Sequence, residues 1–157
     1  DFPCFIIGEI GINHNGSMEM AKKLILNAKH CGCDAVKFQK RTVDIVYSKE
    51  ELEKPRESVF GTTNGDLKRG LEFSLEQYKE IDKYCRELGI IWFASCWDVN
   101  SVDEMESIDM CAHKIPSALL TNDELLKKIK KNRKTDFIID RHVNRRRNRP
   151  CYWDFVA

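Results

Sequence analysis

The sequence predicts an α/β domain in which short apolar strands alternate with amphipathic helices along the chain. Three observations indicate this class. Apolar runs recur, each is followed by a helix with a polar N-cap, and a glycine stands where each of the first two helices should end. Strands connected by helices in this way are expected to be parallel, with right-handed crossovers.

The expected strands are apolar runs bounded by polar or turn-forming residues. They cover residues 4–8, 35–39, 90–94, 111–115 and 137–139. The first run leads directly into Glu9, Asn13, His14 and Asn15. This places Glu9 at or just past the carboxyl end of a strand, where parallel α/β proteins bind ligands.

The helices are expected from their caps and their apolar faces. The expected N-caps are Ser17, Ser74, Ser101 and Thr121, and in the last three a Glu or Gln three residues later completes a capping box. Gly32 and Gly89 end the first two helices. The expected core positions are Ala21, Leu24, Ile25, Ala28, Cys31, Tyr78, Ile81, Cys85, Leu88, Val102, Met105, Ile108, Leu125, Leu126 and Ile129.

The bulk composition excludes several classes of protein. The chain has 157 residues, of which 42% are hydrophobic and 32% charged, with a net charge of +1, which fits one ordinary domain with no preference for nucleic acid. No apolar run reaches the roughly 20 residues that cross a bilayer, and no signal peptide precedes Phe5, so we expect a cytosolic protein without membrane contact. Seven cysteines without C-x-x-C pairs predict buried reduced thiols rather than a zinc site or disulfides.

Two segments depart from the repeating strand and helix pattern. The connection over residues 40–73 is long and charged, and we expect a lid or substrate wall there, because long connections in compact α/β proteins are usually functional. Residues 133–157 form an atypical Arg-rich tail, set apart from a unit at residues 1–132. The charge of the tail alone would suit nucleic acid, but no nucleic-acid-binding motif accompanies it.

Polar side chains stand at the carboxyl end of each expected strand. In chain order they are Glu9, Asn13 and His14; Lys37 and Gln39; Ser95 and Asp98; and Lys114, Ser117 and Asn122. Two lysines that face one pocket would repel each other unless an anion neutralised them. The pattern therefore predicts an anionic ligand, most naturally a phosphate.

Each of these residues also has a structural interpretation. Lys37 and Lys114 lie within apolar runs, where a solvated lysine is improbable, so the function is favoured for both. His14 and His113 are each more often packed or hydrogen-bonded than catalytic. Asp98 either belongs to the site at the carboxyl ends of the strands or caps the third helix, and the sequence leaves these two interpretations equal.

Four motifs in order resemble the sialic acid synthase family. Residues 4–16 are similar to the opening strand and loop of that family, residues 34–39 to its second strand, residues 71–74 to the entry of its second helix, and residues 113–117 to its Tyr-Lys-Ile-Gly/Ala-Ser stretch. The resemblance covers residues 4 to about 130. It implies a partial TIM (β/α)8 barrel of four to five N-terminal βα units. Because a whole barrel needs roughly 200 residues or more, we expect an N-terminal fragment, from a frame-shift or deletion, that is inactive alone.

The resemblance also implies a reaction and roles for residues. Family members condense phosphoenolpyruvate with an N-acetylated amino sugar, such as N-acetylmannosamine, to give a nonulosonic acid and phosphate, using Mn or Mg and pairing as homodimers. Glu9 would manage a proton or the attacking water, while Lys37, Lys114 and Ser117 would hold phosphoenolpyruvate. The remaining implied substrate contacts are Gln39, which would contact the sugar, Ser95, Asn13 and His14. His142 would be a metal ligand, by a loose similarity of its segment to a late barrel strand.

Two residues depart from the family pattern. Leu119 stands where family members usually carry an acid two positions after the serine, and Pro116 replaces a small residue. Three alternatives to the synthase remain at this point: another phosphate-using barrel enzyme, a non-catalytic phosphosugar-binding module and an inactive remnant.

Overall fold

The centre of the fold is a five-stranded sheet. The computed structural model describes residues 4–131 and 135–138. Its sheet contains β1 (Ile7–Gly11), β2 (Ala35–Lys40), β5 (Ile91–Cys96), β6 (Ala112–Ile115) and β7 (Thr135–Ile138), in that spatial order. Every pair is parallel, as the sequence predicts. The spatial order follows the chain order without a reversal, which is the winding of a (β/α)8 barrel rather than of an open, doubly wound sheet.

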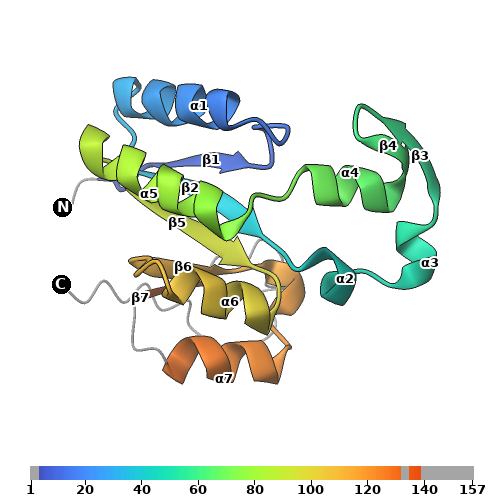
Figure 1. The fold of residues 1–157 in the computed structure, drawn as a ribbon. Coiled ribbons are helices and arrows are strands. Elements are labelled where there is room, and N and C mark those ends of the chain that lie inside the picture. The colour runs from blue at the N-terminus through green and yellow to red at the C-terminus, as the bar shows by residue number, and fades with distance from the viewer. Residues whose placement is uncertain (1–3, 132–134, 139–157) are drawn as a thin grey trace.

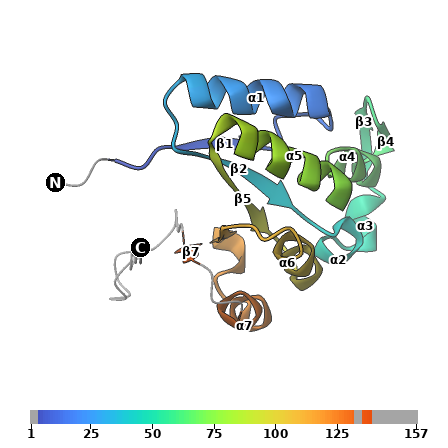
Figure 2. The same cartoon turned by 60° about the vertical axis from the view of Figure 1, so that its left-hand side comes forward.

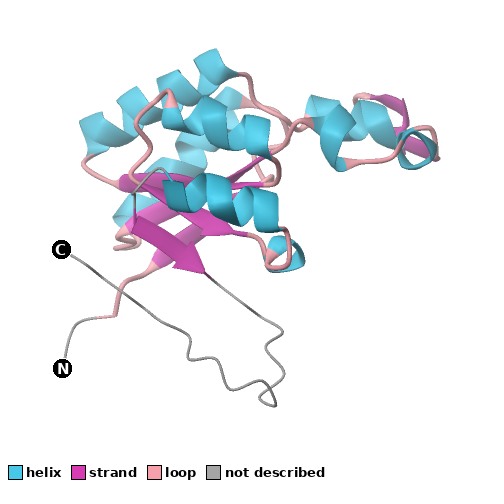
Figure 3. Ribbon diagram, turned by 90° about the horizontal axis from the view of Figure 1, so that it is seen from below, coloured by secondary structure: helices cyan, strands magenta, loops and turns pink. Residues whose placement is uncertain are grey.

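Four helices cover one face of this sheet. They are α1 (Met18–His30), α5 (Leu75–Leu88), α6 (Val99–Glu106) and α7 (Asp123–Lys131). Figure 2 shows them along the outer side of the curved sheet, and Figure 3 shows the strands as one group with helices above and in front of them. Phe38 and Trp92, on neighbouring strands, both contact the ring of Tyr78 on α5. The main apolar core therefore lies between the sheet and the helices.

The predicted caps of the first two long helices are confirmed. Ser17 accepts a hydrogen bond from the backbone N of Met20 at 3.2 Å, and Ser74 forms a reciprocal capping box with Gln77. Gly89 ends α5 in the left-handed conformation, with φ +63°. These signals are local, so the sequence is enough to read them.

The predicted caps of the next two helices are wrong by a few residues. Asp98, not Ser101, caps α6: its Oδ1 accepts a hydrogen bond from the backbone N of Ser101 at 2.8 Å. Asn122, not Thr121, accepts from the backbone N of Leu125 at 3.0 Å at the start of α7. In each case, the true cap is the aspartate or asparagine directly before the first helical residue, and its side-chain oxygen accepts from a free N–H group of the first turn.

The first strand also starts later than predicted. It begins at Ile7 because the backbone N–H groups of Asp34 and Ala35 bond to the carbonyl of Ile6, which sets the pairing with β2. Glu9 therefore lies inside β1, opposite Lys37, and not past the end of the strand. The predicted fifth strand is found as β7, with Ile139 outside the described residues.

The prediction of buried cysteines is correct for Cys85 and Cys96 only, among the cysteines that the structure describes. Cys4, Cys31 and Cys111 are exposed. Their exposure follows from position, since each lies just outside a strand or helix rather than on its inner face. Cys33 is partly exposed, and none of the six described cysteines forms a disulfide.

The long connection folds into an excursion between β2 and α5. It contains α2 (Val43–Val46), α3 (Lys49–Leu52), the antiparallel pair β3 (Pro55–Ser58) and β4 (Gly61–Thr63), and α4 (Asn64–Gly70). Figure 1 shows it projecting from the carboxyl end of β2. That end of the sheet is the side on which the site residues were expected. None of the helices in the described part of the chain is long and apolar enough to cross a membrane.

Candidate functional site

A buried lysine on β2 is the centre of the candidate site. The Lys37 side chain is only 4% exposed, and its Nζ lies 2.9 Å from Oε1 of Glu9 on β1. The same Nζ donates to Oγ of Ser95 on β5 at 3.2 Å and to the carbonyl of Phe38 at 3.3 Å. Three adjacent strands thus bring an ammonium, a carboxylate and a hydroxyl together.

The register of the strands extends this group. Glu9 pairs with Lys37, and Ser95 is the register partner of both Gln39 and Lys114. Directly paired residues of adjacent strands point to the same face of a sheet, and so do residues two apart on one strand. All five side chains therefore belong to the face opposite the helices, which is the inner face of a barrel.

Arg41, just past β2, is held from several sides. Its backbone N and its Nη1 donate to the two carboxylate oxygens of Glu72, at 3.1 and 3.2 Å. Its other terminal nitrogen donates to Oε1 of Gln39, and the guanidinium lies 5.1 Å from the ring centroid of Trp97. Nε of Arg41 has no acceptor among the residues that the structure describes. Burial raises the pKa of Glu72, although the charge of Arg41 opposes that rise.

Gly11, at the end of β1, lies beneath two of the site side chains. Its φ is +56°, in the left-handed region. A Cβ on Gly11 would lie 2.9 Å from Oε1 of Glu9 and 3.3 Å from Nε2 of Gln39. The carboxylate of Glu9 and the amide nitrogen of Gln39 therefore converge over this glycine.

The loop after β1 separates the two polar residues that follow Glu9. Asn13 is exposed at the surface. His14 is 1% exposed, stacks on Phe73 with ring centroids 4.0 Å apart, and accepts a hydrogen bond from the backbone N of Gly16. Burial lowers the pKa of His14 to about 4. These contacts favour the packing interpretation of His14.

The low pKa of His14 predicts a loss of stability in acid. The unfolded chain should titrate near 6.5, so between about pH 6.5 and 4 it binds the proton that the folded chain, with a pKa of about 4, does not. The contribution of His14 to the free energy of unfolding is therefore fully present above pH 6.5. It falls by about 3 kcal/mol as the pH drops to 4. Urea unfolding of wild type and His14→Phe across this range should show the extra fall in the wild type alone. Parallel pH profiles would contradict the assignment.

The residues at the end of β6 are less buried. Lys114 is partly buried, and Ser117 opens the short 3₁₀ helix η1 (Ser117–Leu119) after Pro116. His113 points to the helix side instead, where it is fully buried and paired with Glu106. The predicted separation of His113 from Lys114 is therefore observed.

Asp98 serves a structural purpose at the rim. Its two oxygens accept hydrogen bonds from the backbone N and the hydroxyl of Thr42 and from the backbone N and the hydroxyl of Ser101. Burial alone would raise the pKa of Asp98, but these hydrogen bonds outweigh it and lower the pKa. Of the two interpretations that the sequence left equal, the helix cap is the one observed.

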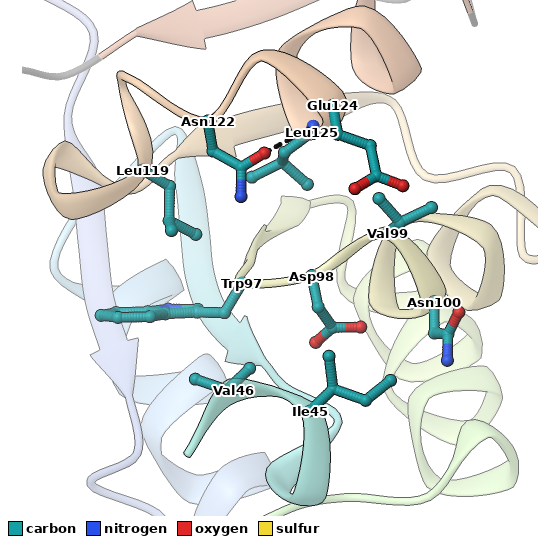
Figure 4. Close-up of a pocket in the computed structure, with 10 residues that line it drawn as sticks. All are labelled: Ile45, Val46, Trp97, Asp98, Val99, Asn100, Leu119, Asn122, Glu124 and Leu125. Atoms are coloured by element: carbon teal, nitrogen blue, oxygen red, sulfur yellow. Dashed lines mark hydrogen bonds between the residues drawn. The ribbon is translucent and has the colours of Figure 1, made fainter. Parts of the chain in front are cut away.

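A pocket of about 440 Å³ opens beside Asp98, at the carboxyl end of the sheet. Figure 4 shows the Trp97 ring along one side, Leu119 on the neighbouring wall, and Asn122 bonded to the start of α7. The other lining residues are Ile45, Val46, Asp98, Val99, Asn100, Glu124 and Leu125. The pocket mixes an aromatic ring and apolar groups with amides and carboxylates, which suits a polar organic ligand of moderate size.

Comparison with known proteins assigns the chain to a family. The NeuB family model matches residues 24–139. The chain belongs to the NeuB family. It is 41% identical over 131 residues to the N-acetylneuraminate-9-phosphate synthase of Mus musculus, covering 82% of this chain and 36% of that protein. It is 36% identical over 122 residues to the N,N'-diacetyllegionaminic acid synthase of Legionella pneumophila, covering 76% of this chain and 34% of that protein.

Solved structures of NeuB-like proteins share the fold. The spore coat polysaccharide biosynthesis protein SpsE of Bacillus subtilis matches with a TM-score of 0.69 and 34% identity, over 88% of this chain and 36% of that one. The N-acetylneuraminic acid synthetase of Leptospira borgpetersenii matches with a TM-score of 0.75 and 22% identity, over 87% of this chain and 44% of that one. The chain thus spans about a third of the length of the curated relatives it matches, which agrees with a partial barrel.

Sequence reasoning missed several residues of this candidate site. Arg41, Glu72, Trp97 and Gly11 were not singled out, although Glu72 lies within the motif at residues 71–74. A charged residue directly after a buried strand, as Arg41 is, would have been a usable signal. His142 lies outside the described residues.

Proposed function

We propose that the chain carries the phosphoenolpyruvate-binding part of a synthase that condenses this compound with an N-acetylated amino sugar. The single observation that supports this best is the buried Lys37 beside the half-exposed Glu9, whose side chain is 53% exposed. A buried ammonium needs an anionic partner. Because Glu9 can turn toward solvent, an entering phosphate or carboxylate can take its place beside Lys37.

The proposed condensation needs charged and polar groups of the kind found on the face of the sheet opposite the helices. C3 of phosphoenolpyruvate forms a bond to the aldehyde carbon of the sugar, so positive charge develops at C2 and the aldehyde oxygen becomes an alkoxide. Water then adds to C2 and gives up a proton, and the alkoxide takes up a proton. The C2–O bond to phosphate breaks, so that phosphate leaves with the hydroxyl proton and C2 becomes a ketone. The carboxylate of Glu9 would favour the cationic C2 and orient the water, while Lys37 and Ser95 would hold the phosphate.

The remaining contacts complete the proposal. Lys114 and Ser117 would hold the carboxylate of phosphoenolpyruvate from β6, and Gln39 would contact the sugar. The rim pocket has a volume typical of small-molecule sites and offers room for the sugar chain. Leu119 on its wall replaces an acid of the family pattern, so one polar contact to the sugar is absent.

A divalent metal and a homodimer are further parts of the proposal that rest on family resemblance. The part of the chain that the structure describes contains no group of three His, Cys, Asp or Glu side chains able to hold a metal ion. The described residues alone therefore do not fit a metal ion, and the reaction steps above depend only on side chains.

Calorimetry with the full chain tests the proposal. We expect phosphoenolpyruvate to bind more tightly than pyruvate, which lacks the phosphate that Lys37 and Ser95 would hold. Equal binding of the two, or binding of neither, would refute it. Release of phosphate when N-acetylmannosamine and Mn²⁺ are added identifies a catalyst, whereas phosphoenolpyruvate binding without release favours the non-catalytic binding module.

A further inference from the structure

The orientation of the Gln39 amide is decided by its neighbour Arg41. A guanidinium group carries only hydrogen-bond donors. The side chain of Gln39 must therefore turn its oxygen, Oε1, toward Arg41, as observed. Because the amide is planar, its NH2 group faces the other way, to the point over Gly11 where Glu9 also lies.

Arg41 is itself unable to turn away from Gln39. It is 6% exposed, its guanidinium is paired with Glu72, and it is packed near the ring of Trp97. The backbone N–H of Arg41 also bonds to Glu72, which fixes the two residues together. The amide of Gln39 is thus held in one of its two orientations by a buried guanidinium that is itself held by Glu72 and Trp97.

We infer that Arg41 is a positioning residue that makes Gln39 a hydrogen-bond donor to an oxygen of the amino sugar. Gln39 lies two residues beyond Lys37 along β2, so its Cα is about 6–7 Å nearer the rim. A molecule held at Lys37 therefore has its reaction partner beside Gln39. The group that this amide recognises must be an acceptor, such as a hydroxyl or N-acyl carbonyl oxygen, and not an N–H or an ammonium.

This inference rests on the proposed function only for the identity of the ligand. Without Arg41, the Gln39 side chain would lose its fixed orientation and would have to be ordered each time the sugar binds. The rotamer freedom of a glutamine is enough to weaken binding roughly 10-fold. Binding of phosphoenolpyruvate at Lys37 does not use Gln39 and should not change.

The main test is the double variant Arg41→Met/Glu72→Gln, which removes the guanidinium without leaving a buried carboxylate unpaired. In the ligand-free full chain, ¹⁵N relaxation of the Gln39 side-chain amide should show a rigid group in the wild type and a mobile one in the variant. Calorimetry with N-acetylmannosamine, at saturating phosphoenolpyruvate, should show a roughly 10-fold weaker sugar affinity. The affinity for phosphoenolpyruvate should be unchanged.

Two further variants sharpen this test. Arg41→Lys keeps a buried cation beside Glu72, so it guards against loss of folding, but one ammonium cannot reproduce the fork to both partners; it should also weaken sugar binding. Arg69→Met removes an exposed arginine of the same excursion, paired with Asp44, and should change neither affinity.

The outcomes separate this inference from the proposed function. A Gln39 amide that stays rigid in the double variant, or an equal loss of affinity for sugar and phosphoenolpyruvate, would overturn the positioning role. If the wild type binds neither compound, the proposed function fails, and the relaxation measurement still decides whether Arg41 fixes Gln39.

Discussion

Replacing Lys37 by methionine is expected to remove most of the affinity for phosphoenolpyruvate while the chain stays folded. The ammonium supplies charge-assisted hydrogen bonds to the phosphate, so its loss should weaken binding roughly 10- to 100-fold. Methionine has a similar volume and fills the same buried space. Glu9, the carboxylate left behind, is half-exposed and can be hydrated, so the free energy of unfolding should change by only about 1 kcal/mol.

Lys40→Met is the matched control for this prediction. Lys40 lies on the same strand and is also buried, but it points to the helix side, where it pairs with Glu104 at 3.0 Å and donates to the carbonyl of Phe73. Calorimetry with phosphoenolpyruvate should show a large loss for Lys37→Met and none for Lys40→Met, with both variants folded by circular dichroism. An equal loss of phosphoenolpyruvate affinity in both variants would mean that the buried lysines of β2 act only by supporting the structure of the sheet.

Much of the fold can be predicted because its signals are local. The box of Ser74 and Gln77, the cap at Ser17 and the left-handed Gly89 each involve residues close in sequence. The start of β1 could not be predicted in the same way, since residues 4–8 and 7–11 are both largely apolar. The choice between them depends on bonds from Asp34 and Ala35 to Ile6, across the whole of α1.

The residues of the candidate site also differ in whether the sequence can predict them. Glu9, Lys37 and Ser95 could be grouped from sequence because parallel strands bring their ends to one side of a sheet. Their grouping survives the shift of β1, since the pairing of Glu9 with Lys37 is set by register. Arg41 meets Glu72 only after the excursion has folded back, and a partner 31 residues away has no periodic signal. His14 was left open because its packing depends on Phe73, which is also distant in sequence.

The excursion packs against the loop after β1 at two glycines, Gly16 and Gly70, and we expect substitution there to have a large effect on stability. Gly16 lies in the loop after β1 and has φ +72°. A Cβ on Gly16 would lie 2.3 Å from the carbonyl oxygen of Gly70 and 3.2 Å from the ring of Phe60. A Cβ on Gly70 would in turn lie 2.2 Å from the Phe60 ring. The two backbones and this ring therefore touch without room for one more carbon atom.

Gly16→Ala should lower the free energy of unfolding by about 2–5 kcal/mol, because it combines a left-handed alanine with a clash against backbone. Gly32→Ala separates these two causes. Gly32 also has a positive φ, +80°, but nothing lies within 4 Å of its Cβ position, so only the conformational cost of about 1–2 kcal/mol applies. Urea unfolding of both variants gives the difference directly. Limited proteolysis should also cut the excursion faster in Gly16→Ala alone, because the clash forces Gly70 and Phe60 away from the loop after β1; equal stabilities and equal cleavage would show that the excursion is held by other contacts.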